Sequence, residues 1–207
     1  MITFKTHTLD TVPKGSKKIL EAVNTKYKFI PNALAVYAES PTLLDSYVTL
    51  SAIFEKSSLN ETERQIILMT NSIENVCGYC TAAHTTISKM SGVPDDVIES
   101  VRAGKPINDP KLEALRKFSI IINKTRGWAS AEQVEEFLNA GYSKQTILEV
   151  IVGTSIKVLS NYTNHIAEPQ LDDAFASNAW IKNTPSDPGE LAFRHILITN
   201  LIVTDFV

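Results

Sequence analysis

An all-α fold is predicted by three features of this chain of 207 residues. Apolar side chains recur at helical spacing over long stretches, as in the series from Ile147 to Val158. Residues that cap helices stand before such stretches, and glycine or proline follows them. No run of alternating apolar and polar residues is flanked by hairpin turn signals. We therefore expect a fold made of helices alone.

In the first part of the chain, each helix is predicted from its start signal. An early helix is expected over residues 16–27. The next helix is expected to start after Ser40, which serves as the cap. Pro41 then takes the first helical position, where its missing N–H is not needed. Asn60, with a glutamate three residues later, forms a capping box. The stretch that follows, up to Ile73, is apolar on more than one face, which indicates a buried helix.

Four further helices are predicted in the second part of the chain. A short helix opens at Pro94, and Asp109, followed by proline, starts the next. Ser130, with a glutamine three residues later, forms a second capping box. Ser143 starts a long apolar helix that stops before Pro169. The helical pattern therefore extends through both halves of the chain.

The chemistry is indicated by the only two cysteines, which form a CxxC motif at Cys77 and Cys80. His84 follows one helical turn later, and positions i, i+3 and i+7 lie on one face of a helix. Two thiols that can pair, beside an imidazole that can share a proton, favour redox chemistry. Two alternatives stay open at this point: a zinc site, for which the motif supplies three ligands, and a pair of inert core thiols.

Charge and hydropathy limit the partners and the compartment. The formal net charge is -3, and no basic cluster of the kind that binds nucleic acid is present. The N-terminus lacks the basic start and apolar run of a signal peptide, and the apolar segment 195–207 is too short to span a bilayer. We therefore expect a cytoplasmic protein with no nucleic-acid or membrane partner. In that compartment a CxxC motif is typical of a working dithiol rather than a structural disulfide.

One helical domain is expected over residues 1–182, because the break at residues 106–110 is too short to separate two domains. Residues 183–207 begin with turn-forming residues and show no strong helical pattern, so we expect a linker and tail there. Outside the motif, we expect His7 to be exposed and Trp128 to lie in the core or in an interface.

The block at residues 62–68, followed by the CxxC motif and by Ala83-His84, resembles the carboxymuconolactone decarboxylase / alkylhydroperoxidase D-like family. The similarity extends over residues 27–175. Supporting similarities occur at residues 29–32, 40–41, 164–168 and 171–175. The resemblance implies an alkylhydroperoxidase D-like helical fold and oligomers built from helical protomers.

The resemblance also implies a dithiol-dependent hydroperoxide reductase. Cys80 would be the peroxidatic thiol, Cys77 the resolving thiol, and His84 part of the proton relay. A small hydroperoxide would be the substrate, and a thiol or protein disulfide reductant would be the partner. Neither a metal nor an organic cofactor is expected, because the two thiols carry the electrons. The alternatives are a decarboxylase that acts on a small lactone acid, and a metal-binding or redox-sensing module with little turnover.

The chain departs from the family at Gln65, where the family's relay has a glutamate eleven intervening residues before the first motif cysteine. Glutamine forms hydrogen bonds but does not take a proton. Glu74, one turn before Cys77, is the nearest carboxylate that could substitute. A straight helix would hold Gln65 ~18 Å from Cys77, so we predict that the chain turns near Glu74. Tyr79 is a candidate for a pocket wall, and His165 is a further candidate for lining the site.

Overall fold

The computed structural model describes residues 3–181, and these residues form helices, turns and loops with no strand. The predicted all-α class is therefore confirmed. The helices are α1 (Lys14–Tyr27), α2 (Asn32–Tyr37), α3 (Pro41–Phe54), α4 (Glu61–Glu74), α5 (Gly78–Met90), α6 (Asp95–Arg102), α7 (Pro110–Thr125), α8 (Ala131–Asn139), α9 (Lys144–Ala167) and α10 (Asp173–Ala176). Within this part of the chain, no helix has both the length and the apolar character needed to cross a membrane. The tail predicted at residues 183–207 lies outside the described residues.

Five of the predicted helix starts are confirmed by the hydrogen bonds of their cap residues, at α3, α4, α7, α8 and α9. Helix α6 follows Pro94 as predicted but has no side-chain cap, and α1 begins at Lys14, two residues before the predicted start. At α4, the Asn60 side chain accepts from the Glu63 backbone N–H at 3.0 Å, and the Glu63 carboxylate accepts from the Asn60 N–H at 2.9 Å. Ser130 and Ser143 form capping boxes at α8 and α9. Helices α3 and α7 begin with proline after a capping side chain. The N–H groups exposed at these helix starts are therefore satisfied by neighbouring residues.

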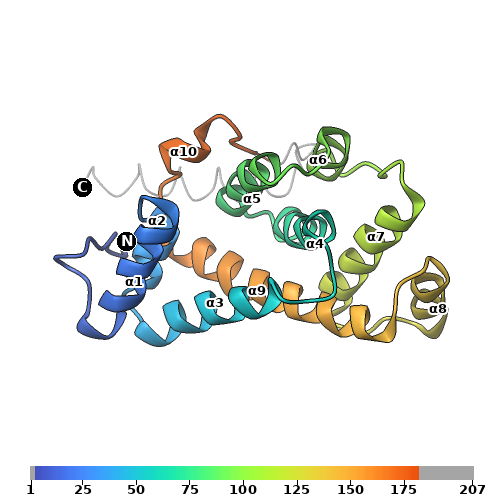
Figure 1. Ribbon diagram of the computed structural model, residues 1–207, viewed down its shortest axis with the longest axis horizontal. Helices are drawn as coiled ribbons and strands as arrows, with labels where there is room; N and C mark the ends of the chain where they lie inside the picture. The colour runs from blue at the N-terminus through green and yellow to red at the C-terminus, as the bar shows by residue number, and fades with distance from the viewer. Residues whose placement is uncertain (1–2, 182–207) are drawn as a thin grey trace, which may run out of the picture.

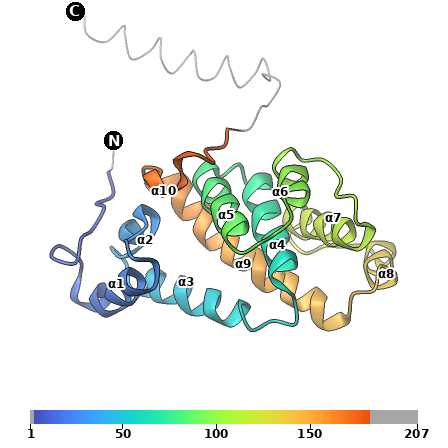
Figure 2. The same ribbon diagram turned by 45° about the horizontal axis from the view of Figure 1, so that its top comes forward.

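Helix α4 lies at the centre of the molecule and contacts α5, α6, α7 and α9 (Figure 1). The 24 residues of α9 run along the length of the molecule, with α1 to α3 towards one end and α7 and α8 at the other (Figures 1 and 2). Helix α5 contacts α4, α6, α9 and α10. Side chains from α4, α5 and α9 can therefore meet in one place.

Two clusters of buried apolar side chains form the core. The larger cluster includes the fully buried Ile67 and Leu115 and joins α4, α6, α7, α8 and α9. The smaller cluster includes Leu20 and joins α1, α2 and α3. Tyr47 of α3 packs against both clusters, and its ring meets the Tyr37 ring edge-on at a centroid distance of 5.4 Å. Each large apolar side chain buried in this way contributes about 1.5–3 kcal/mol of hydrophobic free energy.

Two short helices, α2 and α10, lie outside the sequence predictions. They have six and four residues, which is too few turns to produce a periodic pattern. Tertiary contacts hold α2 in place, since the Asp172 carboxylate accepts hydrogen bonds from the backbone N–H of Asn32 at 3.1 and 3.2 Å. Segments 29–32 and 171–175 thus meet, although they lie far apart in the sequence.

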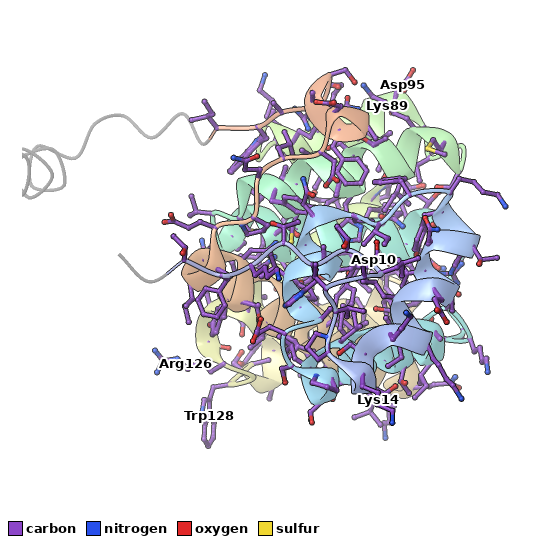
Figure 3. All side chains as sticks on the ribbon, turned by 90° about the vertical axis from the view of Figure 1, so that its left-hand side faces the viewer. Asp10, Lys14, Lys89, Asp95, Arg126 and Trp128 are labelled. Atoms are coloured by element: carbon purple, nitrogen blue, oxygen red, sulfur yellow. The ribbon has the colours of Figure 1, made fainter. Side chains whose placement is uncertain are left out.

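The expectation for His7 is wrong, and so is the core alternative for Trp128. His7 is buried, because one ring nitrogen bonds the Thr11 carbonyl oxygen at 2.9 Å and the other the Glu39 carboxylate at 2.7 Å. Trp128 does not lie in the core: it is 85% exposed, and its ring projects away from the body of the protein (Figure 3). In the same loop after α7, Ala129 packs against the larger core cluster, as Trp180 does.

Gly153 allows α9 to approach α3 and α4 closely. A Cβ atom at this position would lie 2.7 Å from Ile67 Cγ2 and 2.9 Å from Phe54 Cζ, and both of these side chains are buried. Such distances are well below van der Waals contact, and a close-packed core yields little. Lys157 lies one turn further along α9. Gly153 therefore sets how near the second half of α9 comes to the rest of the core.

We predict that Gly153→Val lowers the free energy of unfolding by about 1–3 kcal/mol, because the new methyl groups overfill the contact with Ile67 and Phe54. Ser155→Val is the matched control, since Ser155 is exposed on the same helix and the change introduces the same β-branched residue. The control should shift stability by no more than about 0.5 kcal/mol. Chemical denaturation of both variants measures the difference, and equal losses would contradict the packing argument.

Candidate functional site

A sharp turn after α4 brings residues of α4 and α5 together, as predicted. Helix α4 ends at Glu74, and two residues later Val76 has a left-handed backbone with φ of 56°. The Cys77 N–H donates to the Ser72 carbonyl at 2.8 Å, and the Val76 N–H donates to the Ile73 carbonyl at 3.0 Å. This pair of bonds is a Schellman motif, which usually has glycine at the left-handed position. The β-branched Val76 is strained there, directly before the first thiol.

Both thiols are buried at the N-terminal end of α5. Cys77 is the N-cap residue and is 2% exposed, and Cys80, the third helical residue, is 5% exposed. Neither cysteine is in a disulfide. His84 lies one turn beyond Cys80 and is also buried. The fold thus brings the three motif residues together, and the helix N-terminus favours negative charge on the sulfurs.

One amide group from α9 contacts both sulfur atoms. Asn164 Nδ2 donates to Cys80 Sγ at 3.2 Å and to Cys77 Sγ at 3.7 Å. The other end of the amide is fixed, because the Tyr37 hydroxyl donates to Asn164 Oδ1 at 2.7 Å. The same hydroxyl lies 3.1 Å from the Ser160 carbonyl oxygen. Tyr37 therefore orients the amide so that its N–H groups, rather than its oxygen, face the dithiol.

Four polar side chains of α9 form the wall opposite the cysteines, and the sequence predictions missed them. They are Lys157, Ser160, Asn161 and Asn164. Ser160 Oγ lies 3.9 Å from Cys80 Sγ. Asn161 Oδ1 accepts from Asn75 Nδ2 at 2.9 Å. These residues continue the buried stripe of α9 that begins with apolar side chains. The change from apolar to polar side chains on the buried face of this long helix is visible in the sequence, and it could have identified these four residues.

The two thiols differ in proton affinity. A hydrogen bond from the Cys77 thiol, the charge of Lys157 and hydrogen bonds from α9 outweigh burial and hold the pKa of Cys80 well below its ordinary value. The same hydrogen bond to Cys80, together with burial, raises the pKa of Cys77. Of the two thiols, Cys80 is therefore the one that loses its proton more readily, and Cys77 the one that keeps it.

The tautomer of His84 is set by residues of α4. Gln65 Nε2 donates to Glu61 Oε1 at 2.9 Å, so its Oε1 faces His84 Nδ1 at 3.0 Å. A carboxylate accepts only, so the amide cannot turn over without losing its bond to Glu61. His84 Nδ1 must therefore carry the hydrogen, and Nε2 is left as the acceptor. Burial and the charge of Lys157 keep the pKa of His84 well below its ordinary value, so the ring is neutral.

The remaining candidates lie away from the sulfurs. Glu74 pairs with Lys124 at 3.0 Å on the α7 side of α4. The Tyr79 hydroxyl donates to Asp172 at 2.5 Å and accepts from the Ala33 N–H at 3.2 Å, so it ties α5 to the segments around α2 and α10. Burial, and next the hydrogen bond to Asp172, raise the pKa of Tyr79. His165 is exposed and stacks on a neighbouring tyrosine. Of the four additional candidates, only Gln65 contacts a motif residue.

Within residues 3–181, no group of three or more His, Cys, Asp or Glu side chains is arranged to hold a metal ion. The zinc alternative therefore gains no ligand set from these residues.

Fold and site together define an all-α protein with a buried dithiol at the start of a helix. Residues 41–107, which include the CxxC motif and His84, match the model of the carboxymuconolactone decarboxylase family. This match agrees with the family resemblance noted from the sequence, and it covers residues 41–107. A comparison with curated proteins gave no match.

Solved structures share the fold at low sequence identity. An uncharacterized peroxidase-related protein with an alkylhydroperoxidase AhpD core, from Ralstonia eutropha JMP134, superposes with a TM-score of 0.74 at 21% identity, over 83% of this chain and 93% of that one. A peroxidase-related protein from Silicibacter sp. TM1040 gives 0.70 at 19% identity, over 84% and 93%. The debrominase Bmp8, solved with 2,3,4-tribromopyrrole, gives 0.71 at 14% identity, over 86% and 95%. The predicted alkylhydroperoxidase D-like fold is thus confirmed.

The contact between Gln65 and Glu61 predicts the effect of restoring the family's glutamate. Gln65→Glu places a second carboxyl group about 3 Å from the Glu61 carboxylate, and two such groups cannot both ionise readily. At least one carboxyl pKa is then higher in the folded state than in the unfolded chain. The folded variant therefore binds an extra proton just above pH 4, and its stability falls as pH rises through that range.

We expect Gln65→Glu to lose about 1–3 kcal/mol relative to the parent chain at pH 8, and much less at pH 5. Exchanging the two groups, with Glu61→Gln and Gln65→Glu in one chain, keeps one carboxylate and one amide and should recover most of the loss. Denaturation midpoints at both pH values measure this. An equal loss at both pH values would contradict the proposed repulsion.

Proposed function

We propose that the protein is a dithiol-dependent hydroperoxide reductase in which Cys80 attacks the peroxide and Cys77 resolves the product. The observation that carries this proposal is the unequal pair of thiols. Cys80 Sγ accepts the shorter hydrogen bond from Asn164, and its pKa is lowered, whereas the pKa of Cys77 is raised. A nucleophile that is ionised beside a partner that keeps its proton suits both steps of the reaction.

The proposed steps balance in atoms and electrons. The Cys80 thiolate attacks one peroxide oxygen, the O–O bond breaks, and the other oxygen leaves as an alkoxide that takes up a proton. Cys80 is now a sulfenic acid. The Cys77 sulfur attacks the Cys80 sulfur, its proton joins the departing hydroxide, and water leaves as the S–S bond forms. One hydroperoxide and two thiols thus give one alcohol, one water and one disulfide.

His84 suits the role of proton carrier in these steps. Its Nδ1–H is held by Gln65, so Nε2 is free to accept a proton. Because Cys80 is the thiol that ionises first, the neutral imidazole is not needed to deprotonate it, and it can instead accept a proton at Nε2 and pass it to the alkoxide. In this scheme Gln65 positions the ring but carries no proton itself.

Recovery of the dithiol requires an external reductant. A small thiol or a protein dithiol would attack the disulfide and leave Cys77 and Cys80 reduced. Since both sulfurs are buried, we expect the hydroperoxide to be small and the site to open when the reductant reacts. A reducing compartment such as the cytoplasm would supply electrons of this kind.

The first experiment measures the intact mass of the reduced protein before and after one equivalent of an organic hydroperoxide, with free thiols trapped by alkylation. We expect a loss of two hydrogen atoms and of both alkylation sites, because Cys77 and Cys80 close a disulfide. Cys80→Ser should abolish turnover. Cys77→Ser should stop at the sulfenic acid, which a dimedone probe traps as an adduct.

This experiment, together with further assays, distinguishes the alternatives. Two thiols that remain fully alkylated after peroxide would contradict the reductase. Turnover of a small lactone acid that survives alkylation would then favour a decarboxylase, and stoichiometric zinc lost with Cys80→Ser would favour a metal-binding module. Thiol-dependent release of bromide from tribromopyrrole would favour the chemistry named for the debrominase neighbour. A disulfide that forms without turnover would favour a redox sensor.

We also propose that the protein forms a homo-oligomer through the outer face of α9. Five large apolar side chains on this face are exposed at spacings that place them on one side of the helix. They are Leu148, Ile151, Val158, Tyr162 and Ile166, with exposures of 64, 42, 38, 55 and 71%. An exposed apolar stripe of this length is typical of a protein interface.

A pair of substitutions on this stripe tests the oligomer. Val158→Glu combined with Ile166→Glu should convert the assembly to monomers, because both carboxylates would be buried in the interface without a partner. Tyr27→Glu is the control, since Tyr27 is exposed on α1, away from the stripe. Light scattering after size-exclusion chromatography gives the masses. A parent chain that is monomeric at micromolar concentration would contradict the proposal.

A further inference from the structure

Among the residues that the structure describes, buried Lys157 has no partner for its charge. Its residue exposure is 0%, and its Nζ has no hydrogen-bond acceptor within residues 3–181. No carboxylate of the described part of the chain forms an ion pair with it. Burial of an ammonium group without a counter-ion is costly, and a lysine usually extends its amine to solvent instead. A lysine kept in this state therefore calls for a negative group nearby.

The position of Lys157 on α9 directs it towards the dithiol. Lys157, Ser160 and Asn164 follow one another at i, i+3 and i+7, so they lie on one face of the helix. Ser160 and Asn164 approach Cys80 Sγ at 3.9 and 3.2 Å. The charge of Lys157 acts on Cys77, Cys80 and His84.

The other titratable groups around Cys80 do not provide a formal charge. From α5 they are Cys77, which keeps its proton, and His84, which is neutral. Tyr37 of α2 and Tyr47 of α3 also interact with Cys80, and burial raises the pKa of both, so they are protonated. On α4, the side chain that reaches His84 is the neutral amide of Gln65. The thiolate and the ammonium group are therefore the two formal charges that this pocket combines.

We propose that Lys157 is the counter-ion that holds Cys80 as a thiolate, and that it supplies by charge what a relay glutamate would supply by accepting a proton. The two arrangements differ in chemistry. A carboxylate takes the thiol proton during each turnover, whereas a fixed ammonium stabilises the thiolate before substrate arrives. The inference rests on the proposed function only in that Cys80 is the attacking thiol. The charge balance between Lys157 and Cys80 does not depend on which electrophile is attacked.

The test is a thiolate titration in a chain whose only cysteine is Cys80. Cys77→Ser provides this background, and the absorbance of the thiolate at about 240 nm is followed against pH. The chain with both cysteines replaced by serine provides the baseline for tyrosine ionisation. Adding Lys157→Met removes the charge and keeps a side chain of similar length. We expect the titration midpoint of Cys80 to rise by at least about one pH unit, with alkylation near pH 6 slowed about 10-fold or more.

Lys124→Met in the same background is the matched control, because Lys124 pairs with Glu74 at the surface and its loss removes an equal charge. We expect no movement of the midpoint in this control. Denaturation provides a second readout that separates function from structure. Lys157→Met should leave the folded state as stable as before or more stable, because Cys80 can take up a proton when the ammonium is removed and no unpaired charge then stays buried.

An unchanged midpoint in Lys157→Met would overturn the inference, whatever the stability of the variant. If the methionine chain does not fold, Lys157→Gln decides in the same titration, because it also removes the charge and keeps an N–H donor. A raised midpoint without any reaction with hydroperoxide would support the counter-ion and contradict the reductase. A hydroperoxide reaction with an unchanged midpoint would support the reductase and contradict the counter-ion.

Discussion

The close approach of α9 to α4 and α3 at Gly153 is the constraint on which the site depends. A side chain at this position would meet Ile67 and Phe54 at less than 3 Å, so glycine allows two backbones to come nearer than most residue pairs permit. The half of α9 that follows is thereby brought against α5. From there the Asn164 amide reaches both thiols, and Lys157 lies on the same face of the helix. A wider separation would remove the Asn164 contacts, and burial would then favour the protonated thiols.

Burial and charge oppose each other throughout this pocket. Desolvation alone would raise the pKa of both thiols and leave the dithiol unreactive. The structure instead distributes hydrogen-bond donors unequally between the two thiols. Tyr37 orients the Asn164 amide, which lies nearer to Cys80 than to Cys77. The charge of Lys157 also acts on Cys80. A thiolate and an ammonium that compensate each other in a dry pocket are each tolerated because the other is present. Burying the thiolate and the ammonium is costly, but it yields an ionised nucleophile that is shielded from solvent.

The departure of this chain from the pattern of the family that it resembles is explained by the neighbours of Gln65. Gln65 occupies the position of a relay glutamate, yet it does not leave His84 without direction. The Glu61 carboxylate, one turn earlier on α4, orients the amide, and the amide orients the imidazole. The carboxylate that acts on His84 through the amide thus belongs to residue 61, one turn further from the site than residue 65. Since Gln65 carries no charge, residue 65 of α4 does not neutralise the effect of the Lys157 charge on the thiols.

The sequence by itself determined the helices, their starts and the redox motif, because caps, proline positions and helical periods act between residues a few positions apart. It also required a turn between Gln65 and Cys77, since a straight helix would hold them too far apart. Only the tertiary structure decided that Asn164 bonds Cys80, 84 positions away, that Lys157 has no carboxylate partner among the described residues, and that His7 is buried. Contacts between distant segments depend on how whole helices pack. A polar residue in an apolar helix marks a site of interest, but the partner it meets is fixed by the fold.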